Sequence, residues 1–323
     1  QLYANIPAGC LPTTSDNIKN GIYMGKYVTN INWFPGHMTK ALRMMEKEIK
    51  IVDAIIYVLD ARAPFSCVNP KLNKLIGDKP IIYVLNKCDM ANLEITKTWQ
   101  EYFAKLGSGC IMLNSTESGT AKKVENAVVQ ALHAKIEKLK QKGVKFILRV
   151  MVLGVPNSGK STLINNLCGS AKTQTGNKAG VTRGKQWVKI ASGIEVLDTP
   201  GTLWPAFDNN QVAHHLAYIG SIKEEVLDVP SLSLDLILDL INIDKNILTD
   251  RYKIEILQED EPVNILEKIC ENRGFLLKKN ELDYDRGAFA VLNDFKQNRL
   301  GKISLETVND IKKLTVKDRK ENA

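Results

Sequence analysis

The chain has 323 residues, of which 44% are hydrophobic and 25% are charged, a composition typical of a globular protein large enough for two domains. No apolar run reaches the roughly 18 residues that cross a bilayer, so a membrane-spanning protein is excluded. The six cysteines have no C-x-x-C spacing, which argues against a zinc site and indicates a reducing, cytoplasmic-type compartment.

The net charge of +8 is unevenly distributed along the chain. Residues 1–206 carry 27 Lys and Arg against 14 Asp and Glu, whereas residues 207–267 carry 4 against 13. Residues 268–323 are basic again, with 13 against 9. A basic excess is either a solvated surface or a footprint for nucleic acid, and the charge alone leaves both interpretations open.

The first predicted elements are a helix and two strands. Residues 1–30 show no clear period, and we treat them as an extension of uncertain origin. From Met38 to Val52 the apolar residues follow a helical period. The runs "AIIYVLD" at 54–60 and "PIIYVLN" at 80–86 are continuously apolar, which is typical of parallel strands covered on both faces.

The alternation of helices and strands continues to about residue 198. We expect a helix over 94–106, a strand over 110–114 and one long helix over 121–142. A fourth strand over 146–154 leads into a glycine-rich loop, and a strand pair follows within 185–198. This pattern predicts a doubly wound α/β fold with a mainly parallel sheet.

The strand pattern ends after about residue 206. The later apolar segments 235–241 and 263–270 are amphipathic helices by their spacing. We therefore expect an α/β domain over 31–206, followed by a smaller all-helical domain over 207–323.

A phosphate-binding loop is predicted between the fourth strand and the helix after it. The sequence "GVPNSGKS" at 154–161 matches G-x-x-x-x-G-K-[ST], whose glycines let backbone N–H groups wrap around phosphates. Lys160 is expected to reach the β- and γ-phosphates and to assist catalysis, and the Ser161 hydroxyl is expected to bind Mg²⁺. The residues expected to bind the nucleotide here are Asn157, Ser158, Gly159, Lys160, Ser161 and Thr162.

A D-x-x-G motif follows about forty residues later, in "VLDTPG". Asp198 is expected to hold Mg²⁺ through water, and the Gly201 N–H to contact the γ-phosphate. A lone D-x-x-G is more often a surface turn, but its spacing from the phosphate loop makes this one significant. Between the two, "AGVTRG" offers Thr182 as the catalytic switch threonine that closes on Mg²⁺ in the triphosphate state.

A guanine-binding motif ends the second predicted strand. "NKCD" matches N-K-x-D, and the Asp89 carboxylate and Asn86 can recognise guanine groups that adenine lacks, while Lys87 is expected to pack over the base. "LNST" ends the next strand and offers Asn114 and Ser115 near the guanine O6. All these loops follow the carboxyl ends of strands, where ligands of such sheets bind.

The order of these motifs is unusual, because in ordinary GTPases the base motif follows the phosphate loop. Cutting a chain elsewhere and rejoining its termini preserves such a site. Along this chain the order is the base motif (86–89), the base loop (113–116), the phosphate loop (154–161), the switch threonine (182) and D-x-x-G (198–201). This order predicts one circularly permuted P-loop GTPase domain.

The segments "NWFPGHMTKAL", "DARAPFSCVNP", "GVPNSGKSTLIN" and "LDTPGTLWP" together resemble the ribosome biogenesis GTPase A family, in the YlqF/YawG group of permuted GTPases. The resemblance covers about residues 31–323 and is most specific in the first two-thirds. It implies a cytoplasmic GTPase that assembles the large ribosomal subunit, binds ribosomal RNA through both domains, and hydrolyses GTP slowly until the subunit stimulates it. Mitochondrial relatives share the motifs, so bacterial and organellar origins both stay open.

The resemblance also bears on catalysis. Many GTPases have Gln directly after D-x-x-G, but here that position is Thr202, to which we assign no catalytic role. The family's proposed substitute corresponds to His37, whose imidazole could orient water. From the residues alone, Pro35, Gly36 and His37 are a turn that starts a helix, so both interpretations of His37 stay open.

Two further hypotheses concern ions and coupling. Asn157 is either a ligand for K⁺ beside the phosphates or a loop hydrogen-bonding residue.

The segment after Gly201 leads directly into the helical domain, and Trp204 and Pro205 are predicted to be its packed, stiff connection. GTP could therefore set the angle between two RNA-binding surfaces. We expect the protein to be a monomer. An alternative function is a guanine-nucleotide sensor with little hydrolysis, which Thr202 favours.

Overall fold

The computed structural model describes residues 31, 35–143, 145–169, 186–191, 193–205 and 207–316. It divides into two compact units. The α/β unit contains Asn32–Lys223 and Lys302–Ala323, and the helical unit contains Glu224–Gly301 together with Ile31. Residues 207–223 and 302–316 thus belong to the α/β unit, whereas the sequence suggested one helical domain from residue 207 onward. No helix in the described ranges is both long and apolar enough to span a membrane.

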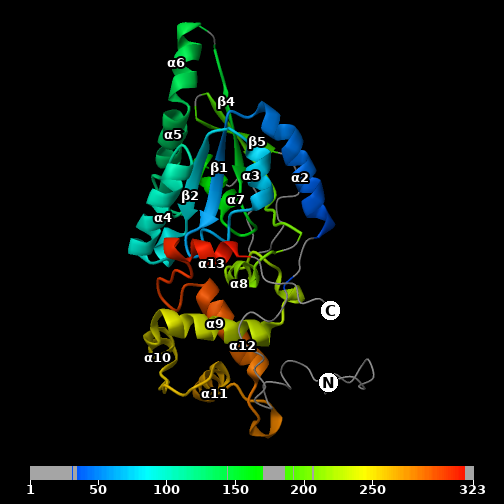
Figure 1. Cartoon of the computed structure of the whole chain (residues 1–323), viewed down its shortest axis with the longest axis vertical. Coiled ribbons are helices and arrows are strands. Elements are labelled where there is room, and N and C mark those ends of the chain that lie inside the picture. Colours follow the sequence, from blue (N-terminus) through cyan, green and yellow to red (C-terminus); the bar gives the residue numbers. More distant parts are fainter. Residues whose placement is uncertain are drawn as a thin grey trace. The chain divides into compact units, whose positions relative to one another are not determined.

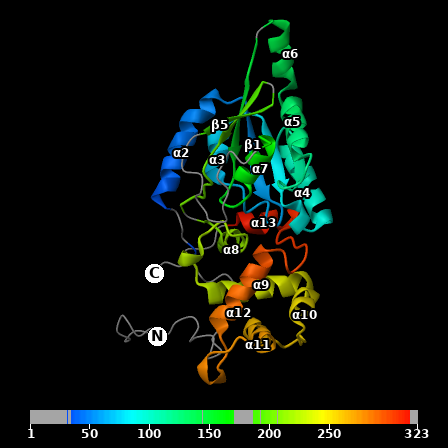
Figure 2. The same ribbon diagram turned by 180° about the vertical axis from the view of Figure 1, so that it is seen from behind.

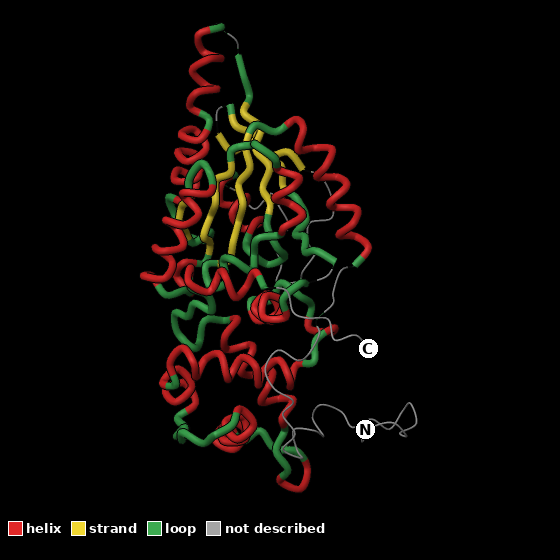
Figure 3. The backbone as a smooth tube through the Cα atoms, in the orientation of Figure 1, coloured by secondary structure: helices red, strands yellow, loops and turns green. Residues whose placement is uncertain are grey.

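The α/β unit is built on a six-stranded sheet with the strand order β3-β2-β1-β4-β6-β5 (Figure 1; Figure 3). Every neighbouring pair is parallel except β5 and β6. The predicted fold class is confirmed. The strands are β1 Ala54–Asp60, β2 Ile81–Asn86, β3 Cys110–Leu113, β4 Leu148–Leu153, β5 Gln186–Ala191 and β6 Ile194–Asp198.

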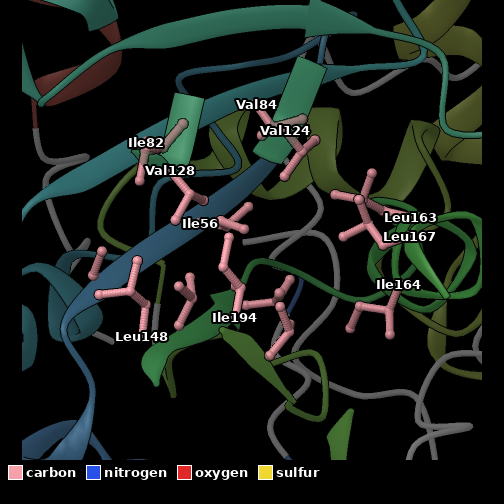
Figure 4. Close-up of a cluster of buried hydrophobic side chains, with 14 of the residues drawn as sticks. Ile56, Ile82, Val84, Val124, Val128, Leu148, Leu163, Ile164, Leu167 and Ile194 are labelled. Atoms are coloured by element: carbon pink, nitrogen blue, oxygen red, sulfur yellow. The ribbon is translucent and has the colours of Figure 1, made fainter. Parts of the chain in front are cut away.

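The sheet is covered on both faces, which explains the continuous apolar runs of its central strands. All seven residues of β1 are buried. Ile56 belongs to a cluster with side chains of α5 and α7, among them Val124 and Leu163 (Figure 4). Successive strand residues point to opposite faces, and the Tyr83 ring lies 4.7 Å from the ring of Phe103 in α4.

The helices of the α/β unit surround this sheet, as the two opposite views show (Figure 1; Figure 2). The predicted single helix over 121–142 is wrong, because the chain leaves helical geometry at Leu132, with φ −105° and ψ 11°. Leu132 is buried like Val128 and Ile136, so the core-facing side continues across the break. The helices are α2 Gly36–Glu48, α3 Pro70–Ile76, α4 Leu93–Leu106, α5 Thr120–Ala131, α6 His133–Gln141, α7 Lys160–Leu167, α8 Asn210–Tyr218 and α13 Ile311–Thr315.

The helical unit is held by apolar helix faces and one close approach. A Cβ atom added to Gly287 in α12 would collide with the Cys270 sulfur of α11, so glycine lets these helices come together. Asp294 accepts hydrogen bonds from Arg251 at 2.7 Å and from the Tyr252 hydroxyl at 3.2 Å. The helices are α9 Val229–Asp244, α10 Asn246–Tyr252, α11 Pro262–Arg273 and α12 Tyr284–Lys296.

The strand order gathers the loops that carry the predicted nucleotide motifs at the carboxyl ends of the strands, around β1 and β4. From β1 the chain proceeds outward to β2 and β3, whereas from β4 it reaches β6 and β5 on the other side. Strand order therefore changes direction between β1 and β4. Ligands of open α/β sheets bind at the carboxyl ends of strands beside such a point.

Candidate nucleotide-binding site

The phosphate loop joins β4 to α7 and has the backbone conformations that its glycines allow. Gly154 has φ +150° and Gly159 has φ +95°, and Asn157 is also left-handed at φ 57°. A Cβ at Gly154 would strike the Val58 carbonyl of β1. The loop therefore lies tightly against the end of the neighbouring strand.

The Lys160 side chain lies within this loop. Its ammonium group donates to the Val155 carbonyl at 2.7 Å, and the residue is only 6% exposed. Burial lowers the pKa of Lys160 to about 8, although the nearby Asp198 carboxylate favours the charged form. Bound phosphates would add negative charge beside the amine and raise this pKa.

The residues expected to bind magnesium come together from two elements. The Ser161 hydroxyl at the start of α7 lies 3.4 Å from a carboxylate oxygen of Asp198 at the end of β6. Hydroxyl and carboxylate oxygens are ligands that suit Mg²⁺. Thr182, the expected third residue, lies outside the described residues.

Gly201 follows on the same turn and must be small. A Cβ there would lie 2.6 Å from the Pro156 Cα and 3.0 Å from the Lys160 Nζ. The distance to the Pro156 backbone is shorter than real Cβ contacts, so the D-x-x-G backbone directly abuts the phosphate loop.

Asn86 connects the base motif, the base loop and the phosphate loop. Its amide oxygen accepts from the Ser115 backbone N–H at 3.0 Å and from the Ser115 hydroxyl at 2.8 Å. Its amide nitrogen donates to the Ser158 carbonyl at 2.7 Å. Because Asn86 is only 1% exposed, these contacts make it a cross-link between loops.

Lys87 also contacts the phosphate loop. Its ammonium group donates to the Asn157 carbonyl at 2.8 Å and to the Asp60 carboxylate at 2.9 Å. The neighbouring Arg62 guanidinium makes two further bonds to Asp60. Although burial alone would raise it, these two cations hold the pKa of Asp60 well below its ordinary value.

Asp89 differs from the rest of its motif. It lies on the short 3-10 turn Cys88–Met90, and its Oδ1 is buried without a hydrogen-bond partner in the described part of the chain. A buried carboxylate oxygen with no partner is costly unless a ligand supplies donors. The Asn114 side chain, by contrast, accepts from the Thr116 N–H at 3.0 Å.

The start of α2 lies next to the segment that follows D-x-x-G. The Leu203 N–H approaches the Met38 sulfur at 3.5 Å. His37 precedes Met38 and is exposed in the first turn of α2, which begins at Gly36. The helix that carries His37 therefore touches the chain two residues beyond Gly201.

Of the residues predicted to pack after the D-x-x-G motif, Trp204 is buried and Pro205 is not. Thr202 is completely buried, and its hydroxyl has no hydrogen-bond partner among the described residues. Trp204 is buried and packs edge-on against Phe207, with ring centroids 5.0 Å apart. Pro205, predicted to be packed beside it, is exposed.

Asn157 and Pro156 are held by the turn that ends α8. The Asn157 amide nitrogen donates to the Gly220 carbonyl at 2.7 Å. The Ser221 hydroxyl donates to the Pro156 carbonyl at 2.8 Å. The loop hydrogen bond weighed for Asn157 is thus present, and residues after 206 support the phosphate loop.

A buried carboxylate that holds the loop after β1 was not predicted from the sequence. Glu306, which is fully buried, accepts from the Phe65 N–H at 2.8 Å, from the Ser66 hydroxyl and backbone, and lies 2.8 Å from the His215 ring of α8. Its carbonyl accepts from the Trp99 indole at 3.0 Å. No local motif marks this residue, because its partners are far away in the sequence.

The segment around Glu306 also borders the base motif. The Ile303 N–H donates to the Met90 carbonyl at 3.1 Å, and the Leu305 N–H donates to the Arg62 carbonyl at 2.8 Å. The sequence signal that could have found it is the alternation of apolar Ile303 and Leu305 with polar neighbours, a pattern typical of extended chain.

Comparisons with known proteins agree with this geometry. A family model described as 50S ribosome-binding GTPase matches residues 149–269. A solved structure of GDP-bound YlqF has a TM-score of 0.59 at 27% identity and covers 83% of this chain and all of that one. A second, GNP-bound YlqF from Thermotoga maritima, has a TM-score of 0.57 at the same identity and covers 83% of this chain and 98% of that one.

The relationship in sequence extends over nearly the whole of a curated relative. Ribosome biogenesis GTPase A of Bacillus cereus is 36% identical over 292 residues, which cover 88% of this chain and 98% of that protein. With the permuted order of its nucleotide loops and this degree of identity, the chain belongs to the ribosome biogenesis GTPase A family.

Proposed function

We propose that this GTPase assembles the large ribosomal subunit, binds ribosomal RNA, and is released after a hydrolysis step that the subunit stimulates. The observation that carries the proposal is that the base motif, the base loop and the phosphate loop meet at Asn86 and Lys87, with the D-x-x-G turn against the phosphate loop. Their order along the chain is the one typical of the family. The names of its relatives and of the matching family model, with their reference to ribosome biogenesis and to the 50S particle, support this role.

In this proposal Asp89 recognises guanine and Asn86 keeps the recognition loop in place. The Asp89 Oδ1 has no internal partner, so the guanine N1 and exocyclic amine can supply its hydrogen bonds. The Asn86 amide is already bonded to Ser115 and Ser158. Asn114 and Ser115 form the loop beside the guanine O6.

The phosphates are bound by the backbone of residues 157–162 and by Lys160. Without nucleotide, the buried Lys160 ammonium group donates to the Val155 carbonyl. When nucleotide enters, this group donates to phosphate oxygens instead. Ser161 and Asp198 hold Mg²⁺, with Thr182 as the third residue, and Mg²⁺ supplies charge neutralisation at the β- and γ-phosphates. Asn157 is proposed as a K⁺ ligand through its amide oxygen, and the bond from its amide nitrogen to the Gly220 carbonyl fixes the orientation of the amide.

His37 is proposed to orient the attacking water when the ribosomal partner fixes the start of α2. The contact between Met38 and Leu203 supports this, because it ties α2 to the D-x-x-G turn. Thr202 cannot replace a glutamine in that role, since its side chain is completely buried. Hydrolysis is therefore slow without the partner.

The two connections to the helical unit are proposed to carry the nucleotide signal. One leaves just after Ser221, which is bonded to the phosphate loop, and the other returns at Ile303, which is bonded beside the base motif. The protein acts as a monomer, in the cytoplasm or, for an organellar homologue, in the mitochondrion. A scattering profile that is the same with GDP and with a non-hydrolysable GTP analogue would contradict this coupling.

Steady-state GTP hydrolysis in KCl, with and without purified large ribosomal subunits, tests the proposal. We expect strong stimulation by the subunits, lost in His37→Ala with nucleotide affinity unchanged. Replacing KCl with NaCl tests Asn157, since a K⁺ ligand requires a lower rate in NaCl. GTP binding without stimulation would instead support the nucleotide-sensor alternative, which the buried Thr202 favours.

A further inference from the structure

Four basic side chains form a stripe along the exposed face of α2 and the 3-10 turn Ile49–Ile51 that follows it. We define the α2 stripe as Lys40, Arg43, Lys47 and Lys50, all of which are exposed. At about 100° per residue they occupy one sector of about 80°. The buried residues Met38, Ala41, Met45 and Ile49 occupy the opposite sector.

None of these four cations has an ion pair or a hydrogen bond within the described part of the chain. Exposed lysines elsewhere in the α/β unit are of both kinds, since Lys97, Lys135 and Lys140 each pair with a carboxylate. The stripe differs in that its unpaired cations follow one another along a single helix face. The acidic residues of α2, Glu46 and Glu48, fall outside the basic sector. The stripe therefore presents uncompensated positive charge.

The distribution of charge between the units also directs a polyanion to this part of the protein. Residues 224–301 carry 10 Lys and Arg against 17 Asp and Glu, whereas residues 32–223 and 302–323 of the α/β unit carry 32 against 18. Steering of a polyanion follows the sign of the local field. The α/β unit, and not the helical unit, therefore supplies the favourable electrostatic surface.

The stripe runs from the nucleotide end of the sheet to the opposite end. Figure 1 shows α2 beginning at the level of the strand carboxyl ends and rising antiparallel to β1. The contact between Met38 and Leu203 fixes its lower end beside the D-x-x-G turn. A ligand on the stripe would thus extend toward His37.

We propose that the α2 stripe is a docking surface for the phosphate backbone of RNA, and that docking there secures the helix that carries His37. This rests on the proposed function. The cations are three or four residues apart, which is about 5 to 6 Å along the helix, and the whole stripe is about 15 Å long. Such a row matches a linear polyanion. A membrane surface is disfavoured, because an interfacial helix must insert its apolar face, and that face of α2 is buried.

The test compares two variants that each lose three positive charges. The stripe variant is Lys40→Gln, Arg43→Gln and Lys47→Gln. The control is Lys138→Gln, Lys142→Gln and Lys145→Gln, at and after α6, where all three side chains are exposed and unpaired in the described part of the chain. Binding of ribosomal RNA and of large subunits is measured from 50 to 300 mM KCl, together with GDP affinity and thermal unfolding as checks of the fold.

Binding to RNA weakens as salt rises, so log K for RNA plotted against log salt has a negative slope. We expect the stripe variant to make this slope shallower by about 2 and to weaken RNA binding about 100-fold at 0.1 M salt. The subunit concentration for half-maximal GTPase stimulation rises, and the maximal stimulated rate falls because α2 and His37 are no longer secured. An unchanged maximal rate would mean that the stripe contributes to binding only. The control variant changes each quantity much less.

Other results would overturn the inference. Equal losses in both variants would mean diffuse attraction without a docking surface, and an unchanged slope in the stripe variant would mean that RNA binds elsewhere. Retained RNA binding with lost binding of an acidic ribosomal protein would assign the stripe to a protein partner. If the unmodified protein neither binds RNA nor responds to subunits, the proposed function itself fails, which is a separate outcome.

Discussion

The nucleotide loops and the C-terminal segment 302–316 both border the same end of the sheet, but they differ in how they are encoded. The loops consist of short motifs whose residues act together within a few positions, such as Lys160 and Ser161. The C-terminal segment acts through single contacts with distant residues, and Ser66 and Glu306 are separated by 240 positions. The phosphate loop is thus encoded locally, whereas its surroundings are encoded across the whole chain.

The two regions also differ in what their polar groups do. Asp89 in the base motif has a buried oxygen with no partner among the described residues, as expected of a group kept for a ligand. Glu306 is completely buried and bonded to the 65–66 backbone and to His215. A buried carboxylate with internal partners supports the structure, and one without them indicates a binding site. Substitutions of the two carboxylates distinguish these two kinds of group.

Glu306→Ala should be the most damaging substitution outside the motifs. It leaves the N–H groups of Phe65 and Ser66 and the His215 ring without their buried partner, so we expect a loss of about 3 to 5 kcal/mol in the free energy of unfolding. Urea denaturation measures it. Lys312→Ala, an exposed position of the same segment, is the control and should change stability by less than about 0.5 kcal/mol. A loss below about 1 kcal/mol for Glu306→Ala would show that the segment is only loosely attached.

Asp89→Asn should change ligand specificity and leave the fold intact. Losing charge-assisted hydrogen bonds to guanine should weaken GDP binding by about 3 kcal/mol, or roughly 100-fold. Xanthosine diphosphate has a carbonyl in place of the exocyclic amine, so the new amide can donate to it. Calorimetry with both nucleotides gives the comparison. If the variant binds GDP as tightly as the unmodified protein, Asp89 does not contact the base.

Nucleotide affinity should fall as the pH rises above about 8. In the free protein the pKa of Lys160 is lowered to about 8, so the ammonium is progressively lost above that pH. Phosphates bind the charged form, and therefore the dissociation constant of GDP should increase up to tenfold per pH unit above this value. Below it the affinity should level off. Guanosine, which lacks phosphates, is the control, and an equal pH dependence for both ligands would assign the effect to the base.

Thr202→Val should have the smallest effect. It replaces a buried hydroxyl that has no hydrogen-bond partner in the described ranges with a methyl group of similar volume. We expect stability to change by at most about 1 kcal/mol, in the stabilising direction, and subunit-stimulated turnover to be retained. A large fall in turnover would instead give the Thr202 hydroxyl a part in hydrolysis.

Sequence reasoning recovered the fold because the sheet is signalled by continuous apolar runs and the loops by fixed spacing. The strands around Ile56, Val84 and Val152 lie where the pattern predicted them. The break at Leu132 was missed, since apolar spacing does not change where a helix bends slightly. The attachment of residues 302–316 was missed because Glu306 looks like any charged surface residue until its partners are known.

The structure shows contacts of the motif residues that the motifs themselves did not predict. Asn86 was expected to read the base, yet its amide is bonded to Ser115 and Ser158. Lys87 was expected to cover the base, and its ammonium group is bonded to Asp60 and to the phosphate loop. A motif specifies which residues gather around a ligand, but packing decides which atoms remain available to it.

The 240 positions between Ser66 and Glu306 also matter while the chain is being made. The β1 edge that β4 later occupies is left without its neighbour until β4 has emerged, and an open strand edge can pair wrongly. The 65–66 loop then waits for Glu306 until the helical unit has been synthesised. Nascent chains shorter than about 306 residues should therefore be more susceptible to proteolysis around residue 65 than the finished protein. Translation thus delivers the carboxylate that holds the 65–66 loop only after the whole helical unit has been made.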